Sequence, residues 1–332
     1  MIRRPPRSTH CISSAASDVY KRQLFTSRPV GDAMATTIWG TSSSWTLTAL
    51  PLFVWMGEIL FRTRLSENLF KGLSPWMQKL PGGLIHVNVV GCALFAAISG
   101  SSAATVATVG KMSIPELRKR NYPEKILLGS LAGSGTLGLL IPPSIILIIY
   151  GVAVQESIAK LFIAGIIPGI MIALIFMSYV IIWSLINKKS MPKIIEEYSF
   201  LEKIKRSKQL LPVIILILAV IGSIYTGIAT ATEAASLGVV GALILSYFQK
   251  SLTLKTFKSS LLGATKTSCM IAFILAGSTF LSLAMGFTGL PRNLALWIQN
   301  MDLSPYVLIF VLMIFYIILG MFLDGISAVV LT

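Results

Sequence analysis

The chain has 332 residues, of which 55% are apolar and 12% charged, about half the charged share of a soluble domain. The apolar residues fall in blocks of roughly 20, the length that crosses a bilayer as a helix, so a soluble globular domain is excluded. The net charge of +15 comes from Lys and Arg in short loops between these blocks and not from a basic stripe with stacking aromatics. Nucleic acid is therefore excluded as a partner, and membrane lipid is expected.

The first 23 residues differ from everything that follows. They are polar and basic and contain no apolar core, so they are not a signal peptide. They resemble translated sequencing-adaptor sequence, and we expect 1–23 to be a non-native leader outside the fold. The remaining cysteines, Cys92 and Cys269, each stand alone in an apolar segment, where a cysteine serves as a small hydrophobe. No disulfide, metal cluster or cofactor is predicted from them.

The apolar segments are predicted to be helices, because only helices and closed barrels satisfy backbone polar groups in lipid. The period-two alternation of barrel strands is missing from the sequence. In chain order the predicted helices span approximately 44–61, 84–98, 103–112, 126–152, 161–186, 210–228, 232–248, 261–285, 306–323 and 328 onward.

The basic loops predict how the chain is oriented in the membrane. The loop 188–209 is rich in lysine and is expected to be cytoplasmic. Counting outward from it places the basic groups before and after 84–112 on the same side of the membrane. That segment must therefore enter and leave from the cytoplasm, which predicts a re-entrant hairpin at about 83–113. The same count makes 306–332 enter from the opposite side, as a second hairpin.

A weak internal repeat supports this arrangement. An offset of 225 residues pairs Asn68-Leu69 with Asn293-Leu294 and Ser99 with Asp324. Together with the opposite entry sides, this offset predicts an inverted repeat, with the binding site where the two halves meet. The predicted divisions are a first repeat over 24–187 that holds the hairpin 83–113 and a broken helix over 126–152, a cytoplasmic basic loop over 188–209, and a second repeat over 210–332 that is cut off within the second hairpin.

The tip of the first hairpin is the first candidate site, and it consists of Ser99, Gly100, Ser101 and Ser102. Small residues allow a sharp reversal, and the ends of two helices leave free carbonyls and amides. Carbonyls and hydroxyls suit a hard cation such as sodium, while a helix N-terminus suits an anionic group. The alternative is that these small residues only allow tight helix packing.

The second candidate site is the predicted break in helix 126–152. A GxGxxG match begins at Gly133, but no strand precedes it, so a dinucleotide site is rejected. Pro142 and Pro143 both lack a backbone donor and break the helix, which frees carbonyls from about Gly138 onward. With Ser144, this break is expected to face the hairpin tip and complete a cation site; the alternative is a simple kink.

Two further polar groups are candidates. Thr230, Thr232 and Glu233 begin a helix on the outer side, where Glu233 is either a first-turn acid or part of the transport pathway. Asp324 and Ser327 occupy the tip of the second hairpin. A carboxylate at this depth is costly and therefore functional by default, either binding a cation or orienting the tip backbone.

Four stretches resemble one known family: AISGSSAATVATVG (97–110), GSGTLGLLIPPSIILIIYG (133–151), TATEAASLGVVGAL (230–243) and GMFLDGISAVVLT (320–332). They are similar, in order and spacing, to the large membrane subunit, of DctM type, of tripartite ATP-independent periplasmic (TRAP) transporters. The resemblance covers about residues 24–332. It implies an all-α polytopic membrane protein with the elevator fold of the ion-transporter superfamily, inverted repeats and two re-entrant helical hairpins, the second incomplete.

The resemblance also implies function. It implies sodium-driven import of organic acids, C4-dicarboxylates or related carboxylates, across the bacterial inner membrane. The implied partners are a small four-helix membrane subunit and a periplasmic substrate-binding protein. One sodium would bind near Ser99, Ser102, Gly138 and Ser144, and a second near Asp324 and Ser327. The second site is expected to be incomplete here, because the family's second Pro-Pro segment would follow residue 332, and this fragment is not expected to transport.

Two rival functions remain open at this point. A stand-alone sodium/carboxylate or anion symporter of the same broad fold would need no binding protein. A channel would conduct without sodium coupling, although hairpins that plug the membrane from both sides argue against an open pore. An enzyme is not supported, because no nucleophile, base and orienting group occur together in the sequence.

Overall fold

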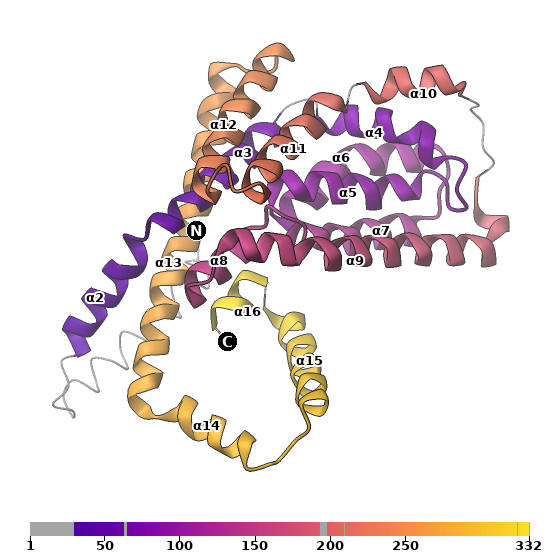
Figure 1. Cartoon of the computed structure of the whole chain (residues 1–332). Coiled ribbons are helices and arrows are strands. Elements are labelled where there is room, and N and C mark those ends of the chain that lie inside the picture. Colours follow the sequence, from indigo (N-terminus) through magenta and orange to yellow (C-terminus); the bar gives the residue numbers. More distant parts are fainter. Residues whose placement is uncertain (1–29, 63–64, 193–197, 209, 324, 332) are drawn as a thin grey trace, which may run out of the picture. The chain divides into compact units, whose positions relative to one another are not determined.

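The computed structural model describes residues 30–332 except 63–64, 193–197, 209, 324 and 332 (Figure 1). The predicted leader 1–23 lies outside the described residues. Within the described ranges every regular element is a helix, which fits a multi-pass membrane protein. Four of these helices are long and apolar enough to span a bilayer, or six spans if two bent helix pairs are counted as one span each.

Two compact units divide the chain: one contains residues 48–151 and 155–267, and the other contains 1–47, 152–154 and 268–332. The elements of the first unit are, in order, α3 (Ala49–Phe61), α4 (Leu65–Met77), α5 (Ile85–Ser99), α6 (Ser102–Lys119), α7 (Glu124–Gly135), η2 (Thr136–Leu139), α8 (Ile145–Val154), α9 (Ile158–Ile186), η3 (Lys188–Ser190), α10 (Phe200–Ser207), α11 (Leu211–Tyr225), α12 (Ala231–Phe248) and the start of α13 (Leu254–Thr288).

Helix α5 is the centre of this unit. It packs against α3, α4, α6, α7, η2 and α9, and Figure 1 shows α6, α7 and α9 running beside it. Its side chains Val89, Cys92, Phe95 and Ala96 are fully buried. A helix that is apolar on all sides is a core helix, which explains why the sequence of α5 shows no polar face. The first arm of the predicted hairpin is therefore surrounded by protein.

The base of the hairpin is closed by local hydrogen bonds. The Leu84 backbone N–H donates to the Tyr122 hydroxyl at 3.1 Å, which ties the start of α5 to the turn after α6. Gly83, with a φ of 54°, lies where a Cβ would be 2.5 Å from the Tyr122 oxygen, so glycine is required for this contact. Burial raises the pKa of the Tyr122 phenol, which therefore stays neutral and able to accept this bond.

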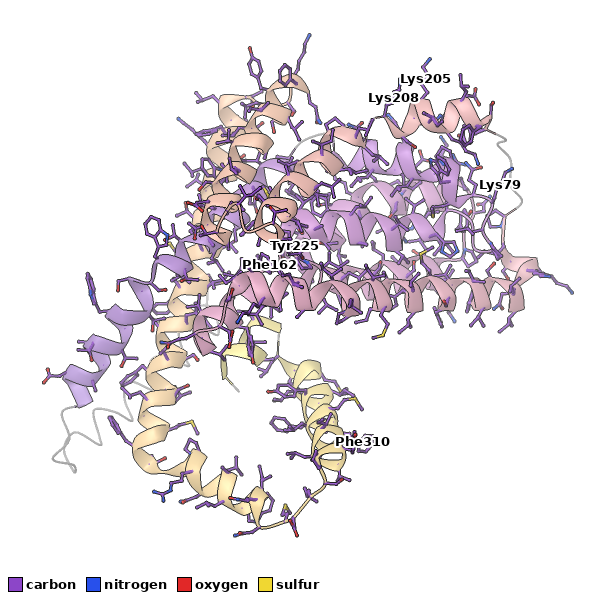
Figure 2. All side chains as sticks on the ribbon, in the orientation of Figure 1. Lys79, Phe162, Lys205, Lys208, Tyr225 and Phe310 are labelled. Carbon is purple, nitrogen blue, oxygen red and sulfur yellow. The ribbon has the colours of Figure 1, made fainter. Side chains whose placement is uncertain are left out.

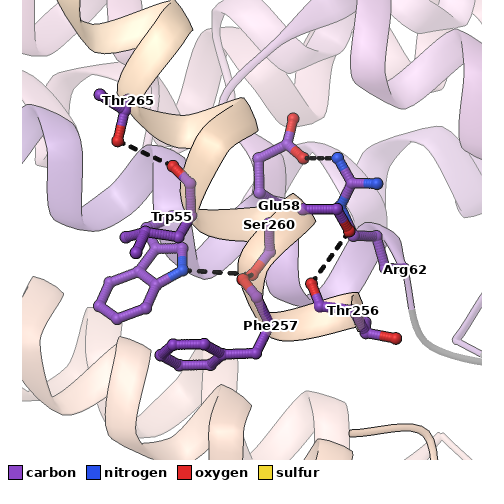
Figure 3. A network of polar contacts seen from close by, with 9 residues as sticks. Trp55, Glu58, Arg62, Thr256, Phe257, Ser260 and Thr265 are labelled. Carbon is purple, nitrogen blue, oxygen red and sulfur yellow. Dashed lines mark hydrogen bonds and ion pairs between the residues drawn. The ribbon is translucent and has the colours of Figure 1, made fainter. Parts of the chain in front are cut away.

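Helices α3, α11 and α12 form a second group within the same unit. Helix α12 packs closely along α3 and against α11. The Tyr225 hydroxyl at the end of α11 donates to the Phe162 carbonyl of α9 at 3.2 Å, which joins this group to the helices around α5 (Figure 2). Figure 3 shows a further link, in which Trp55 Nε1 of α3 donates to the Ser260 hydroxyl of α13 at 3.3 Å.

The other unit contains α2 (Val30–Ser42), η1 (Trp45–Thr48), the later part of α13, α14 (Leu290–Gln299), α15 (Pro305–Phe322) and α16 (Gly325–Leu331). Phe280 of α13 is buried against Met34 and Ala284. Helix α15 begins with a Ser304 N-cap, and most of its large apolar side chains are exposed while none is buried. An apolar helix without buried residues is expected where lipid or another protein surface replaces water.

The predicted helix boundaries agree with the structure at most apolar segments and differ at two places. The predicted segment 44–61 agrees, because η1 and α3 together run from Trp45 to Phe61. Helix α13 is longer than the predicted 261–285, because its first turns are polar and invisible to hydropathy. The loop 188–209 contains α10, an eight-residue helix that begins with a Ser199–Glu202 capping box.

One pair of helix starts shares the predicted offset of 225 residues. Helix α4 begins at Leu65 and α14 begins at Leu290, and each precedes an apolar helix, α5 and α15 respectively. The internal repeat and its inversion in the membrane remain predictions.

Candidate functional site

The first candidate site is the turn 99–102, called the tip below, which joins α5 to α6. Helix α5 ends at Ser99, Gly100 takes a left-handed φ of 59°, and Ser101 is the extended N-cap of α6. The Ser101 hydroxyl accepts a hydrogen bond from the Ala104 N–H at 3.5 Å. Glycine adopts this left-handed conformation without the steric cost of a side chain, so Gly100 makes the sharp reversal possible.

A buried network of hydroxyls and a carbonyl lies behind the tip. The Thr105 hydroxyl donates to the Ser101 carbonyl at 2.7 Å and lies 2.9 Å from the Ser99 hydroxyl. The Ser99 hydroxyl also lies 3.3 Å from the Ser101 carbonyl, so either hydroxyl can be the donor in the contact between Ser99 and Thr105. Thr105 is fully buried and Ser99 nearly so. The sequence analysis missed Thr105, although its position one helical turn after Ser101 was an available signal.

The predicted broken helix is interrupted over residues 136–144. Helix α7 ends at Gly135, one 3-10 turn follows as η2, and α8 starts at Ile145. The Ser144 hydroxyl caps α8 by accepting from the Leu147 N–H at 3.5 Å, and it donates to the Leu139 carbonyl. The α-helix stops earlier than the Pro142-Pro143 pair, because the glycine-rich stretch before it already leaves α-helical geometry.

The tip and the broken helix are in direct contact. The Ile145 N–H, at the start of α8, donates to the Gly100 carbonyl at 3.2 Å. A Cβ on Gly100 would lie 2.7 Å from the Pro143 carbonyl oxygen, and a Cβ on Gly138 would lie 2.8 Å from the Ser101 carbonyl oxygen. These close approaches bring the residues predicted for the first site together at one place in the fold.

Two of the predicted residues lie at the edge of this cluster. Pro142 faces away toward α9, where its Cγ is 3.5 Å from the position of a Cβ on Gly165. Ser102 is the first residue of α6, and its carbonyl oxygen is 3.8 Å from the position of a Cβ on Gly135. Pro142 therefore shapes the break, while Ser102 belongs to the helix start that follows the tip.

Gly57 of α3 is a second residue that the sequence analysis missed. A Cβ on Gly57 would lie 3.0 Å from the Ser99 Cα and 3.4 Å from the Ser99 carbonyl oxygen. Helix α3 therefore contacts the main chain of the tip directly. No pattern in the sequence marks Gly57, because it sits inside an apolar run whose side chains suit any membrane helix.

The donor atoms at the tip are neutral oxygens. Segments 84–110 and 126–154 contain no Asp, Glu, Lys or Arg. Among the described residues no group of three His, Cys, Asp or Glu side chains is placed to hold a metal ion. The hydroxyls of Ser99 and Thr105 gather around the Ser101 carbonyl, and the Gly100 carbonyl lies at the start of α8. Neutral oxygens of this kind suit a hard monovalent cation and not a transition metal.

The start of α12 is a closed capping box. The Glu233 carboxylate accepts from the Thr230 N–H and from the Thr230 hydroxyl, both at 2.8 Å, and the Glu233 N–H donates to the Thr230 hydroxyl at 3.3 Å. Thr232 is buried in the helix packing. These bonds make Glu233 a first-turn acid of α12. Its part in the transport pathway stays a prediction.

The second predicted sodium site involves the second hairpin. Asp324 lies outside the described residues. Ser327 is in α16, a seven-residue helix in the other compact unit, and its side chain is half-buried. The second site therefore stays a prediction from the sequence.

Comparisons with known proteins identify the family of the chain. The sequence profile described as "Tripartite ATP-independent periplasmic transporter, DctM component" matches residues 9–332. The chain is 33% identical to the C4-dicarboxylate TRAP transporter large permease protein DctM of Pseudomonas aeruginosa, over 90% of this chain and 69% of that protein.

Other relatives differ in the solute that their names give. The chain is 31% identical to the sialic acid TRAP transporter large permease protein SiaM of Vibrio cholerae, over 88% of this chain and 68% of that protein. It is 30% identical to the isethionate TRAP transporter permease protein DctMQ of Oleidesulfovibrio alaskensis, over 90% of this chain and 47% of that protein. The similarity therefore extends across relatives named for three solutes.

Proposed function

Because the chain belongs to the DctM family of TRAP transporter large permeases, we propose that it moves an organic acid across the bacterial inner membrane, driven by sodium. Membership of this family makes the chain a multi-pass membrane permease of a transporter that depends on a substrate-binding protein, and not an enzyme. The sodium coupling, the solute class and the inner membrane are the parts that we propose.

The geometry of the tip supports sodium as the coupling ion. The hydroxyls of Ser99 and Thr105 and the carbonyls of Gly100 and Ser101 gather where α5 ends and α8 begins. In transporters with interrupted helices, such unwound carbonyls and helix ends coordinate sodium near the middle of the membrane. We propose that these oxygens hold one sodium ion, with Ser102, Gly138 and Ser144 setting the backbone geometry around it.

The solute is proposed at the level of its chemical class. Relatives named for a C4-dicarboxylate, for sialic acid and for isethionate are similarly close in sequence, so identity does not select among them. An anionic headgroup suits the N-termini of α6 and α8, whose first N–H groups point away from their helices. We propose an organic acid, with C4-dicarboxylates as the first candidates.

Two partners complete the proposed transporter. The family implies a small membrane subunit and a periplasmic binding protein, and the name DctMQ of one relative joins two subunit names. We propose that a small four-helix membrane subunit completes the complex and that the binding protein delivers the solute to the outer face.

Reconstituted uptake tests this proposal. A permease that contains this sequence, with its small subunit in proteoliposomes, is expected to take up radiolabelled solute only when the binding protein and an inward sodium gradient are both present. Uptake without the binding protein would contradict the proposal and favour a stand-alone symporter. Uptake that is equal under sodium and potassium gradients would contradict only the proposal that sodium is the coupling ion.

A further inference from the structure

Helix α10 presents an outward face that the transport function does not use. Ile204, Lys205 and Lys208 follow Leu201 by three, four and seven residues, so the four residues share one face of the helix, called the α10 platform below. Leu201 is 79% exposed and Ile204 is 42% exposed, and both lysines are exposed. Figure 2 shows Lys205 and Lys208 projecting from α10.

A neighbouring face of α10, formed by Phe200, Lys203 and Ser207, is fixed to α4. Trp76 Nε1 donates to the Ser207 hydroxyl at 2.7 Å, and the Trp76 ring packs edge-on against Phe200 with ring centroids 6.3 Å apart. The Lys203 ammonium lies 5.6 Å from the centre of the Trp76 ring. An eight-residue helix is marginal alone, so these contacts hold α10 in place and keep the α10 platform facing outward.

The direction of α10 suits the surface of a bilayer. It is bent by 57° from α11, the apolar helix that follows it. The two helices therefore do not form one straight span, and α10, which is polar and basic where α11 is apolar, is the part that suits the interface between headgroups and acyl chains. The Trp76 side chain beside it is of a kind enriched at that interface.

Most of the charged residues of α10 are basic. The helix and its C-cap carry Lys203, Lys205, Arg206 and Lys208, and the acidic residue Glu202 accepts from the Ser199 N–H at 3.1 Å as part of the capping box. A basic helix with exposed apolar side chains has the pattern of an interfacial lipid-binding helix. Its long lysine side chains can lie along the apolar boundary while their ammonium groups reach phosphates.

We propose that the α10 platform binds anionic phospholipid headgroups, with Leu201 and Ile204 in the acyl boundary and Lys205 and Lys208 on the phosphates. The partner is a lipid and not an acidic protein, because the apolar and basic residues share one exposed face at the start of the apolar helix α11. The platform anchors the connection between α9 and α11 to the bilayer. The proposal requires only that the chain is a membrane protein, so it stands or falls separately from the sodium coupling and the solute.

Competition between two lipids tests the proposal. The whole chain is purified in nanodiscs of equimolar phosphatidylglycerol and phosphatidylethanolamine and released in a native mass spectrometer, where the ratio of the two retained lipids is measured. The double variant K205Q/K208Q is expected to lower the preference for phosphatidylglycerol by ~20-fold, since each lysine near a charged membrane surface contributes about five-fold. The variant K205R/K208R is expected to keep the preference.

A matched control and a second variant make the result decisive. K250Q/K255Q removes two exposed lysines elsewhere in the same unit, and it is expected to leave the ratio unchanged. Leu201→Ser keeps every charge and is expected to lower retention of both lipids. An unchanged lipid ratio in K205Q/K208Q overturns the proposal, and it is the result that an acidic protein partner would give. A fall of the lipid ratio in K250Q/K255Q that equals the fall in K205Q/K208Q also overturns it. Unchanged retention in Leu201→Ser overturns the apolar contact.

Discussion

Helices α6 and α12 begin with the same kind of N-cap, but their N-termini lie in different surroundings. Each has a hydroxyl N-cap, Ser101 or Thr230, that accepts a hydrogen bond from the N–H three residues later, at 3.5 and 3.3 Å. At α12 the Glu233 carboxylate accepts a hydrogen bond from the Thr230 N–H, and Thr230 and Glu233 are exposed. At α6 the surrounding oxygens are buried and face a second helix start. A hydroxyl at a helix start therefore indicates a site only when other main-chain groups converge on it.

Replacing the turn glycine at each place is expected to give the largest difference. Gly100→Ala forces a side chain into a φ of 59° and places Cβ 2.7 Å from the Pro143 oxygen, so we expect a loss of roughly 3 kcal/mol or more. Gly227→Ala, before α12, has a φ of 71° and open space around Cβ, so the loss should be about 1 kcal/mol. Unfolding in detergent by denaturant measures both. Equal losses would show that the tip is no tighter than an exposed turn.

Removing one hydroxyl behind the tip tests the proposed cation site. Thr105→Val keeps the side-chain shape but removes the contacts to Ser99 and Ser101, and it should cost about 1–2 kcal/mol. It should also abolish the rise in thermal stability that we expect when sodium chloride replaces choline chloride.

The matched control for Thr105→Val lies one turn later on the same helix. Thr108 is also buried, and its hydroxyl donates to the Ala104 carbonyl at 2.7 Å, away from the tip. Thr108→Val is expected to lose comparable stability and keep the full response to sodium. A sodium response that survives in Thr105→Val would remove Thr105 from the site.

The smallest effect is expected at the start of α12. Thr230→Ala removes the N-cap hydroxyl and should cost about 1 kcal/mol without changing the response to sodium. Ser236→Ala, at an exposed position of the same helix, is the control and should change stability by less than about 0.5 kcal/mol. Thermal unfolding in sodium and in choline measures both. A weaker sodium response in Thr230→Ala would return this helix start to the transport pathway.

The sequence predicted the parts of the fold that hydropathy and helix-breaking residues record. Ser304 and Pro305 mark the start of α15, and the glycine and proline residues of 133–143 mark the interruption between α7 and α8. The tip residues Ser99 and Gly100 were predicted because small polar residues between two apolar arms are unusual in a membrane segment.

The missed features are those that depend on a neighbour. In the sequence Thr105 is an ordinary polar residue inside a helix, and only the structure shows that its hydroxyl lies 2.9 Å from that of Ser99. Gly57 is a small residue in an apolar run, and only the structure shows that it lies against the tip. Helix α10 was hidden by its charge, because amphipathic surface helices have low hydropathy; its capping box from Ser199 to Glu202 was the local signal that could have revealed it.

The hydrogen bond from the Ile145 N–H to the Gly100 carbonyl has a consequence for how an ion would bind to the tip and leave it. A carbonyl oxygen has two lone pairs, and only one is taken by the start of α8. A sodium ion at the tip would use the other, so α8 keeps its cap whether the ion is present or absent. Binding and release of the ion would then leave this link between the tip and α8 intact.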